Sequence, residues 1–424
     1  MPAHTFVALD YVVLISLLVL SAGIGVLFAW RNRRKNNRQF LTANRELSWV
    51  PVSLSMMASF VSSASVLGMP SEVFVRGSLM WTGAIGSTLA ILMAAFIFMP
   101  MFYKMDVTSI NEGGIKAVVW TDVVQVILIF TAYIMVIACS QYETTLFVLS
   151  FDTSPYETYT TWTMVLGFTV TLMGMYCANQ IQAQRYTSIG SLKGARKALM
   201  LNVPGMALNM IMTVLSGLTL YAVYGRCDPR LTGDIRKADQ LMPYIIQDLL
   251  YQYPGLSGLM AAAVYSSSLS TLSSGYNSLA AVTWEDFLRP CMETSESTAL
   301  KITKVTAATY GILSMLIAFL VGTMESIMQA GLTMGGALCG PRVAIFTLGL
   351  LFPCCKKKGV IAGTVVAVMV TAWISVGSIL YPRKRYTLPT TTEGCLHFNE
   401  TITSGSFEPP RRPRLAGHLT HTFS

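Results

Sequence analysis

Residues 79–103 read LMWTGAIGSTLAILMAAFIFMPMFY and contain no Asp, Glu, Lys or Arg. A helix that crosses a bilayer needs about 20 predominantly apolar residues, and this stretch is long enough. Comparable stretches recur along the chain, so we predict about ten transmembrane helices. They are residues 11–30, 47–71, 79–103, 123–142, 158–184, 198–225, 254–284, 305–324, 326–352 (with Arg342 as its one charge) and 359–382.

The overall composition agrees with these stretches. Of the 424 residues 53% are hydrophobic and only 12% are charged, and the mean hydropathy is +0.54. Soluble domains contain about 25% charged residues, so the composition excludes a soluble enzyme. Strands of a membrane barrel need only about half the length of these stretches. We therefore predict an all-α polytopic membrane protein that is not an enzyme.

The net charge of +9 arises mainly from loops on one side of the predicted membrane. Basic residues cluster in the odd-numbered loops, which the positive-inside rule assigns to the cytoplasm, and this pattern does not favour nucleic-acid binding. We therefore predict a plasma-membrane protein with both termini outside the cell. Residues 383–385 are an exception to the rule, because they are basic and fall on the outer side. A glycosylation sequon begins at Asn399. Residues 401–424 are rich in Pro and Arg and are predicted to be a disordered extracellular tail.

The eight cysteines form no CxxC pair. Cys227 and Cys395 are predicted to lie outside, where oxidation is possible, and Cys354 and Cys355 inside. We expect unpaired thiols, with a Cys227–Cys395 bridge as the alternative. The four histidines all lie outside the predicted helices, which excludes a histidine metal site or proton relay within the membrane.

One predicted helix carries a face of hydroxyl groups at helical spacing, formed by Ser267, Ser270, Thr271, Ser274 and Ser278. Intramembrane carboxylates are almost absent, and Asp122 stands at the start of the fourth stretch. A cation would then be held by neutral oxygens, which suits Na⁺ better than H⁺. Alternatively, the serines bond back to their own helix and permit close helix packing. The residues alone leave both interpretations open.

Two further stretches are unusually polar. Residues 51–70 combine Pro51 and Pro70 with six serines, which predicts either a broken helix whose freed carbonyls line a binding site or a simple proline kink. The fifth stretch ends with four amides, followed by Arg185. The amides form either a gate or an interfacial polar cap with the Arg185 side chain snorkelling to the surface. Without further information we favour the cap.

Six segments together resemble the sodium:solute symporter family, in the branch that carries monocarboxylates, the vitamins biotin and pantothenate, and iodide. They occur in the family's order, and the resemblance covers residues 8–400. The segments are FLTANREL (40–47), MPSEVF (69–74), GGIKAVVWTD (113–122), NQIQAQR (179–185), DQLMP (239–243) and NSLAAVTWED (277–286).

The resemblance implies a LeuT-like core of ten helices in two inverted repeats and Na⁺-coupled symport of a small organic anion. Monocarboxylates are the first choice of substrate, and vitamins or iodide are the alternatives. Na⁺ is the co-transported ion, and Asp122 lies near its inner exit. The remaining implied residues are the sodium ligands Ala58 and Val61 (carbonyls), Ser267, Ser270 and Thr271 (side chains), and the gate or substrate-vicinity residues Asn179, Gln180 and Gln182.

The chain departs from the family pattern near residues 110–113. Two family helices normally separate the segments that meet there, so core helices three and four are missing from an otherwise symporter-like domain of residues 1–400. The family's last helix is also replaced by the tail. A second functional class follows: a truncated, non-transporting isoform that associates with its full-length relative. Arg342 replaces an apolar family position and needs a partner.

Overall fold

The computed structural model describes residues 6–31, 47–104, 115–138, 159–249, 251, 253–292, 295–321, 327–352, 354–381 and 387–395. This part of the chain is helical and contains no β-strand. The α-helices are α1 (Ala8–Arg31), α3 (Trp49–Phe60), α4 (Ser63–Arg76), α5 (Gly83–Met93), α6 (Met99–Lys104), α7 (Ile115–Ala138), α8 (Phe168–Tyr176), α9 (Gln180–Thr187), α10 (Leu192–Tyr224), α11 (Leu241–Leu249), α12 (Leu256–Val282), α13 (Glu296–Val321), α14 (Ile327–Leu351) and α15 (Lys357–Leu380).

Each of the ten predicted stretches contains a helix, which confirms the all-helical class. Within the described residues, six helices are long and apolar enough to span a membrane, or eight if each of two bent pairs is one span. The apolar part of α1 is shorter, and the serine-rich α12 is not in this set. The total of ten spans therefore stays a prediction.

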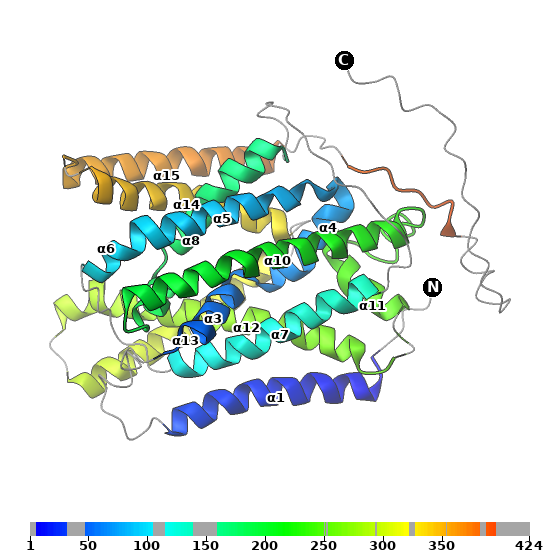
Figure 1. Ribbon diagram of the computed structural model, residues 1–424, viewed down its shortest axis with the longest axis horizontal. Helices are drawn as coiled ribbons and strands as arrows, with labels where there is room; N and C mark the ends of the chain where they lie inside the picture. Colours follow the sequence, from blue (N-terminus) through cyan, green and yellow to red (C-terminus); the bar gives the residue numbers. More distant parts are fainter. Residues whose placement is uncertain are drawn as a thin grey trace, which may run out of the picture.

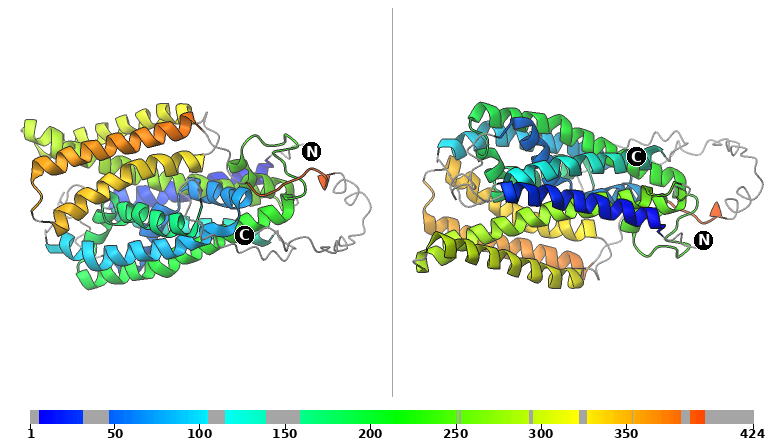
Figure 2. Two further views of the ribbon diagram at one scale, coloured as in Figure 1. Left: turned by 90° about the horizontal axis from the view of Figure 1, so that it is seen from above. Right: turned by 90° about the horizontal axis from the view of Figure 1, so that it is seen from below.

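The helices form a bundle in which most run along one common direction (Figures 1 and 2). Helix α10 packs against α3, α4, α5 and α7, and α12 packs against α1, α3, α4, α7 and α13. The main apolar core lies among these helices, with Val52, Ile129 and Leu199 fully buried. In contrast, the spanning segments of α13 and α15 have no buried residues, as expected for helices that face lipid.

Two helices are broken in the middle of the bundle. Helices α3 and α4 meet at an angle of 58° around Val61, and α8 and α9 meet at 61°. The first break lies at neither proline of its segment: Pro51 is in the first turn of α3, where its missing N–H costs nothing, and Pro70 lies inside α4. The interpretation as a proline kink is therefore wrong, and the broken helix is confirmed. The second break was not predicted.

Residues 387–395 form a strap across the ends of α4 and α10. The Leu388 N–H donates to the Val75 carbonyl (2.7 Å), and the Tyr221 hydroxyl donates to the Pro389 carbonyl (3.0 Å). Further backbone bonds align the strap with residues 225–228 and bring Cys227 and Cys395 together in a disulfide. The expectation of unpaired thiols is wrong for this pair, because backbone pairing places the two cysteines side by side.

The two ends of the bundle carry different parts of the chain. The start of α1 and the strap lie at one end, and the turn between α14 and α15 lies at the opposite end (Figure 1). Because the start of α1 and the strap lie at the same end, the arrangement agrees with an even number of crossings between these two segments. The 105–114 junction, residues 383–385, Asn399 and the 401–424 tail lie outside the described residues.

Candidate functional site

Asp122 occupies the interior of α7 and not its first turn. The helix begins at Ile115, two turns before the position at which the sequence pattern placed it, and the Asp122 side chain has no solvent exposure. The prediction of a carboxylate at the helix start is therefore wrong. A buried negative charge needs hydrogen bonds and a counter-charge, since desolvation otherwise makes it very costly.

Three other helices supply the partners of this carboxylate. Ser55 on α3 donates its hydroxyl to Asp122 Oδ2 (2.5 Å), and Ser270 on α12 donates to Oδ1. Arg185 on α9 forms an ion pair with Oδ2 over 3.1 Å. Together with Ser274 these residues are called the Asp122 cluster. The cluster joins a predicted sodium ligand, Ser270, to the predicted exit residue, Asp122.

Arg185 is buried, with 3% of its side chain exposed. Its Nε donates to Ser55 Oγ (2.8 Å), and its Nη2 donates to Ser274 Oγ (3.4 Å) as well as to Asp122. The predicted snorkelling of this side chain to the interface is therefore wrong. A guanidinium stays protonated in proteins, so its burial depends on the Asp122 charge. The spacing of base and acid along the chain gave no signal of this pair.

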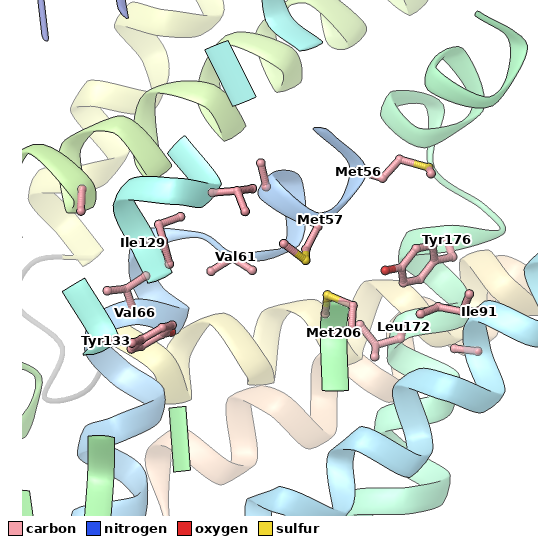
Figure 3. Close-up of a cluster of buried hydrophobic side chains, with 14 of the residues drawn as sticks. Met56, Met57, Val61, Val66, Ile91, Ile129, Tyr133, Leu172, Tyr176 and Met206 are labelled. Atoms are coloured by element: carbon pink, nitrogen blue, oxygen red, sulfur yellow. The ribbon is translucent and has the colours of Figure 1, made fainter. Parts of the chain in front are cut away.

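The break between α3 and α4 frees two carbonyl groups. In an unbroken helix the amides of Ser62 and Ser65 would bond Ala58 and Val61, but they donate to Phe60 (3.1 Å) and Ser62 (2.9 Å). Ala58 and Val61 are both buried, and Figure 3 shows Val61 among the apolar side chains of the core. Two buried carbonyl oxygens thus lack their helical donors and are available to a cation.

The hydroxyl face of α12 lies on a helix that packs against both α3 and α4. Ser267 and Thr271 donate to the carbonyls of Val264 (2.8 Å) and Ser267 (3.2 Å) in their own helix. Back-bonding is therefore correct for these two hydroxyls, although their oxygen lone pairs remain able to hold a cation. The described residues contain no group of His, Cys, Asp and Glu suited to a metal.

The amides after the second break have separate roles. Asn179 caps α9 by accepting the Ile181 N–H (3.0 Å), a local structural role. The side chain of Gln180 lies outside the described structure. Gln182 is buried, and its Oε1 has no hydrogen-bond partner among the described residues, while Gln184 accepts from Ser278 (3.3 Å). A purely interfacial cap is therefore wrong for Gln182 and Gln184, because both are buried inside the bundle.

A second polar network joins the two breaks. Asn202 on α10 donates to both the carbonyl (3.0 Å) and the hydroxyl (2.8 Å) of Ser53 on α3. Tyr176, at the end of α8, donates to Asn202 Oδ1 (3.4 Å) and stacks on Phe60 with ring centroids 4.1 Å apart. Sequence reasoning missed this network, although an asparagine within the uncharged stretch 198–225 was its signal.

Arg342, whose partner the sequence did not indicate, donates through Nη2 to Cys339 Sγ at 3.2 Å. This contact is with a neutral sulfur one turn earlier on α14. The structure therefore gives this charge a hydrogen-bond acceptor on its own helix, and this contact supplies no counter-charge.

Comparisons with known proteins agree on one family. The sodium:solute symporter family matches residues 40–112 and 108–367. Sodium-coupled monocarboxylate transporter 2 of Mus musculus is 32% identical over 484 residues, covering 95% of this chain and 78% of the relative. The sodium/iodide cotransporter of Homo sapiens is 30% identical over 491 residues, with coverages of 96% and 76%.

A solved structure also shares the fold. It is described as the substrate-bound outward-open state of a Na⁺-coupled sialic acid symporter, and it superimposes with a TM-score of 0.69 at 18% identity, covering 91% of this chain and 100% of that one. Sodium is the co-transported ion throughout this group, and its members are symporters and not enzymes. The chain is therefore a multi-pass membrane protein that belongs to the sodium:solute symporter family.

Proposed function

We propose that the Asp122 cluster and the neighbouring helix break serve Na⁺-coupled symport of small organic anions, monocarboxylates first, across the plasma membrane by alternating access. The observation that carries the proposal is the hydrogen bond from Ser270 to Asp122, next to the broken helix α3–α4. The similarity to sodium-coupled monocarboxylate transporters supports this substrate class.

In this proposal the Ala58 and Val61 carbonyls and the hydroxyls of Ser267, Ser270 and Thr271 hold the sodium ion. Five oxygens on two neighbouring helices suit a hard cation. Asp122 lies beside Ser270 and offers the first carboxylate on the way out. Arg185 holds that carboxylate as an ion pair at 3.1 Å, so the pair is an inner gate that is closed when formed. Gln182 belongs to the same region of α9 and contributes to the gate or substrate path.

The sodium ligands are tested by replacing Ser270 and Thr271 together with alanine. Loss of two of five oxygens should raise the half-saturating Na⁺ concentration at least tenfold, which corresponds to about 1.4 kcal/mol of binding free energy. Ser273→Ala is the matched control, because this hydroxyl bonds back to the Ser270 carbonyl (3.1 Å) in the same helix. An unchanged sodium dependence in an active double variant contradicts the assignment.

The substrate is tested by an uptake screen with and without Na⁺. Lactate and nicotinate represent monocarboxylates, biotin represents the vitamins, and iodide is included because the human sodium/iodide cotransporter is 30% identical. We expect the sodium-dependent uptake to be of the monocarboxylates, at a low rate in this chain and at a higher rate once the two absent helices described below are restored. Uptake confined to biotin or iodide assigns the chain to the corresponding alternative of the same branch.

We also propose that two core helices are absent between Ile110 and Gly113. Two observations support this: the two family matches meet at residues 108–112, and the alignments run over more positions than the 424 residues of this chain. Polar faces of the core would then lack protein partners, which is unfavourable in lipid. We expect this chain to insert correctly but to transport poorly, as in the alternative of a non-transporting partner of a full-length relative.

Inserting the two helices of a full-length relative between Ile110 and Gly113 should restore Na⁺-dependent uptake. Uptake by the 424-residue chain at a rate near that of the restored version contradicts the proposal.

Topology is tested separately through Asn399, which should carry a glycan if the chain ends outside the cell. A mobility unchanged by endoglycosidase, with an inner-loop tag accessible from outside, contradicts the predicted orientation.

A further inference from the structure

The turn between α14 and α15 presents two thiols. Residues 352–358 read FPCCKKK, and α14 ends at Leu351 while α15 begins at Lys357. The Cys355 N–H donates to the Phe352 carbonyl (3.1 Å), which closes the turn. Cys354 and Cys355 are both free and exposed, whereas Cys177, at the end of α8, and Cys339, in α14, are free but buried.

This turn lies at the edge of the bundle. The nearby apolar residues Leu351 and Ile361 are 54% and 53% exposed, and the spanning part of α15 has no buried residue. Figure 2 shows α14 and α15 together at one side of the molecule. Helix α14 packs against α8 and α4, so lipid lies against α15 and the outer face of α14, and the thiols lie where these helices leave the membrane.

Three lysines follow the cysteines directly. Lys356 occupies the N-cap position of α15 without a side-chain capping bond, and Lys357 and Lys358 form the start of its first turn. Positive charges at this end of a helix add to the positive end of its macrodipole, which is unfavourable without nearby anions. The phosphates of anionic lipids on the cytoplasmic leaflet supply such anions. The charge distribution therefore holds the cysteine pair against the membrane surface.

We propose that Cys354 and Cys355 are sites of S-acylation by a long-chain fatty acyl group. The acyl donor is a fatty acyl-coenzyme A: the cysteine sulfur attacks the thioester carbonyl carbon and forms the new C–S bond. The C–S bond to coenzyme A breaks, and the departing thiolate takes up the proton that the cysteine loses, so nothing is oxidised or reduced. Exposed cysteines next to a membrane span are the typical acceptors of this modification. The proposal requires the predicted cytoplasmic orientation of this turn. It does not depend on which anion the protein transports.

The test is acyl exchange on the 424-residue chain expressed in animal cells. Hydroxylamine cleaves the thioester, and a mass tag on the released thiol should shift the protein by one or two steps. Cys354→Ser with Cys355→Ser should abolish the shift. Cys291→Ser is the matched control, because Cys291 is also exposed and free but has no lysines after it, and the shift should persist.

A second set of variants tests the lysines. Replacing Lys356, Lys357 and Lys358 with glutamine should reduce the acylated fraction at least twofold, whereas arginine at all three positions should preserve it. A wild-type protein without a hydroxylamine-dependent shift overturns the proposal, as does a shift that persists in the double serine variant. Labelling of the wild-type chain with an alkynyl fatty acid, followed by mapping of the modified peptide, decides the matter without any variant.

Discussion

Removal of the Arg185 charge should strongly destabilise the protein. In Arg185→Met, Asp122 stays wholly buried and keeps only the hydroxyls of Ser55 and Ser270 as partners. Two unit charges 3.1 Å apart attract with about 5 kcal/mol at an effective dielectric constant of about 20. Breaking a buried pair by removing one partner generally costs about 3–5 kcal/mol. We therefore expect the free energy of unfolding to fall by about 3–5 kcal/mol.

The magnitude is measured by denaturant unfolding of the purified protein in detergent, followed by intrinsic fluorescence. Asp122→Asn should be similarly destabilised, because it leaves the Arg185 guanidinium buried without a counter-charge. The double variant should lose about 0.5–3 kcal/mol less than the sum of the two single losses, because the residues are in direct contact. Sodium should also stabilise Arg185→Met more than the wild type, since Na⁺ can replace the guanidinium at Asp122.

Arg289→Met is the matched control for this experiment. Arg289 also pairs with a carboxylate, Glu285 (2.6 Å), but 66% of its side chain is exposed. Exposed pairs are screened by water and contribute little, so this variant should unfold like the wild type. An unfolding free energy of Arg185→Met equal to that of the control, or strictly additive losses in the double variant, refutes the role of the buried pair.

Three further predictions concern other contacts. Gly217→Ala should lower the free energy of unfolding by about 1–3 kcal/mol in a thermal unfolding assay, because the added methyl would lie 2.7 Å from the Pro70 carbonyl. Gly363→Ala on α15 is the control: its methyl meets nothing within 4 Å, so this variant should unfold like the wild type. Asp10→Ala should cost about 1–2 kcal/mol in denaturant unfolding, because its carboxylate accepts the Gly255 N–H (2.8 Å) at the start of α12. Burial raises the pKa of Asp228, but hydrogen bonds from Arg230 outweigh this effect and hold that pKa below its ordinary value. The stability that this pair contributes is therefore complete above about pH 4 and is lost as the pH falls through the lowered pKa. In Asp228→Asn, the free energy of unfolding measured against pH should lose this dependence.

Much of the architecture could be predicted from local sequence. Each uncharged stretch contains a helix, because a charge is costly in lipid wherever it falls along a span. The hydroxyl face of α12 follows from the spacing of Ser267, Ser270 and Thr271 alone. The prolines and serines of residues 51–70 indicated a broken helix, although the break at Val61 lies between the two prolines and not at either of them.

What the sequence by itself determined is therefore local: the helical class, the stretches that contain helices, the serine face and the family. The tertiary structure alone decided which distant residues meet, because docking of the helices sets those distances and no periodicity of the chain encodes them. Asp122 and Arg185 are 63 residues apart, and Cys227 and Cys395 are 168 apart. Burial then enforces the ion pair, since neither charge is stable without the other inside the bundle.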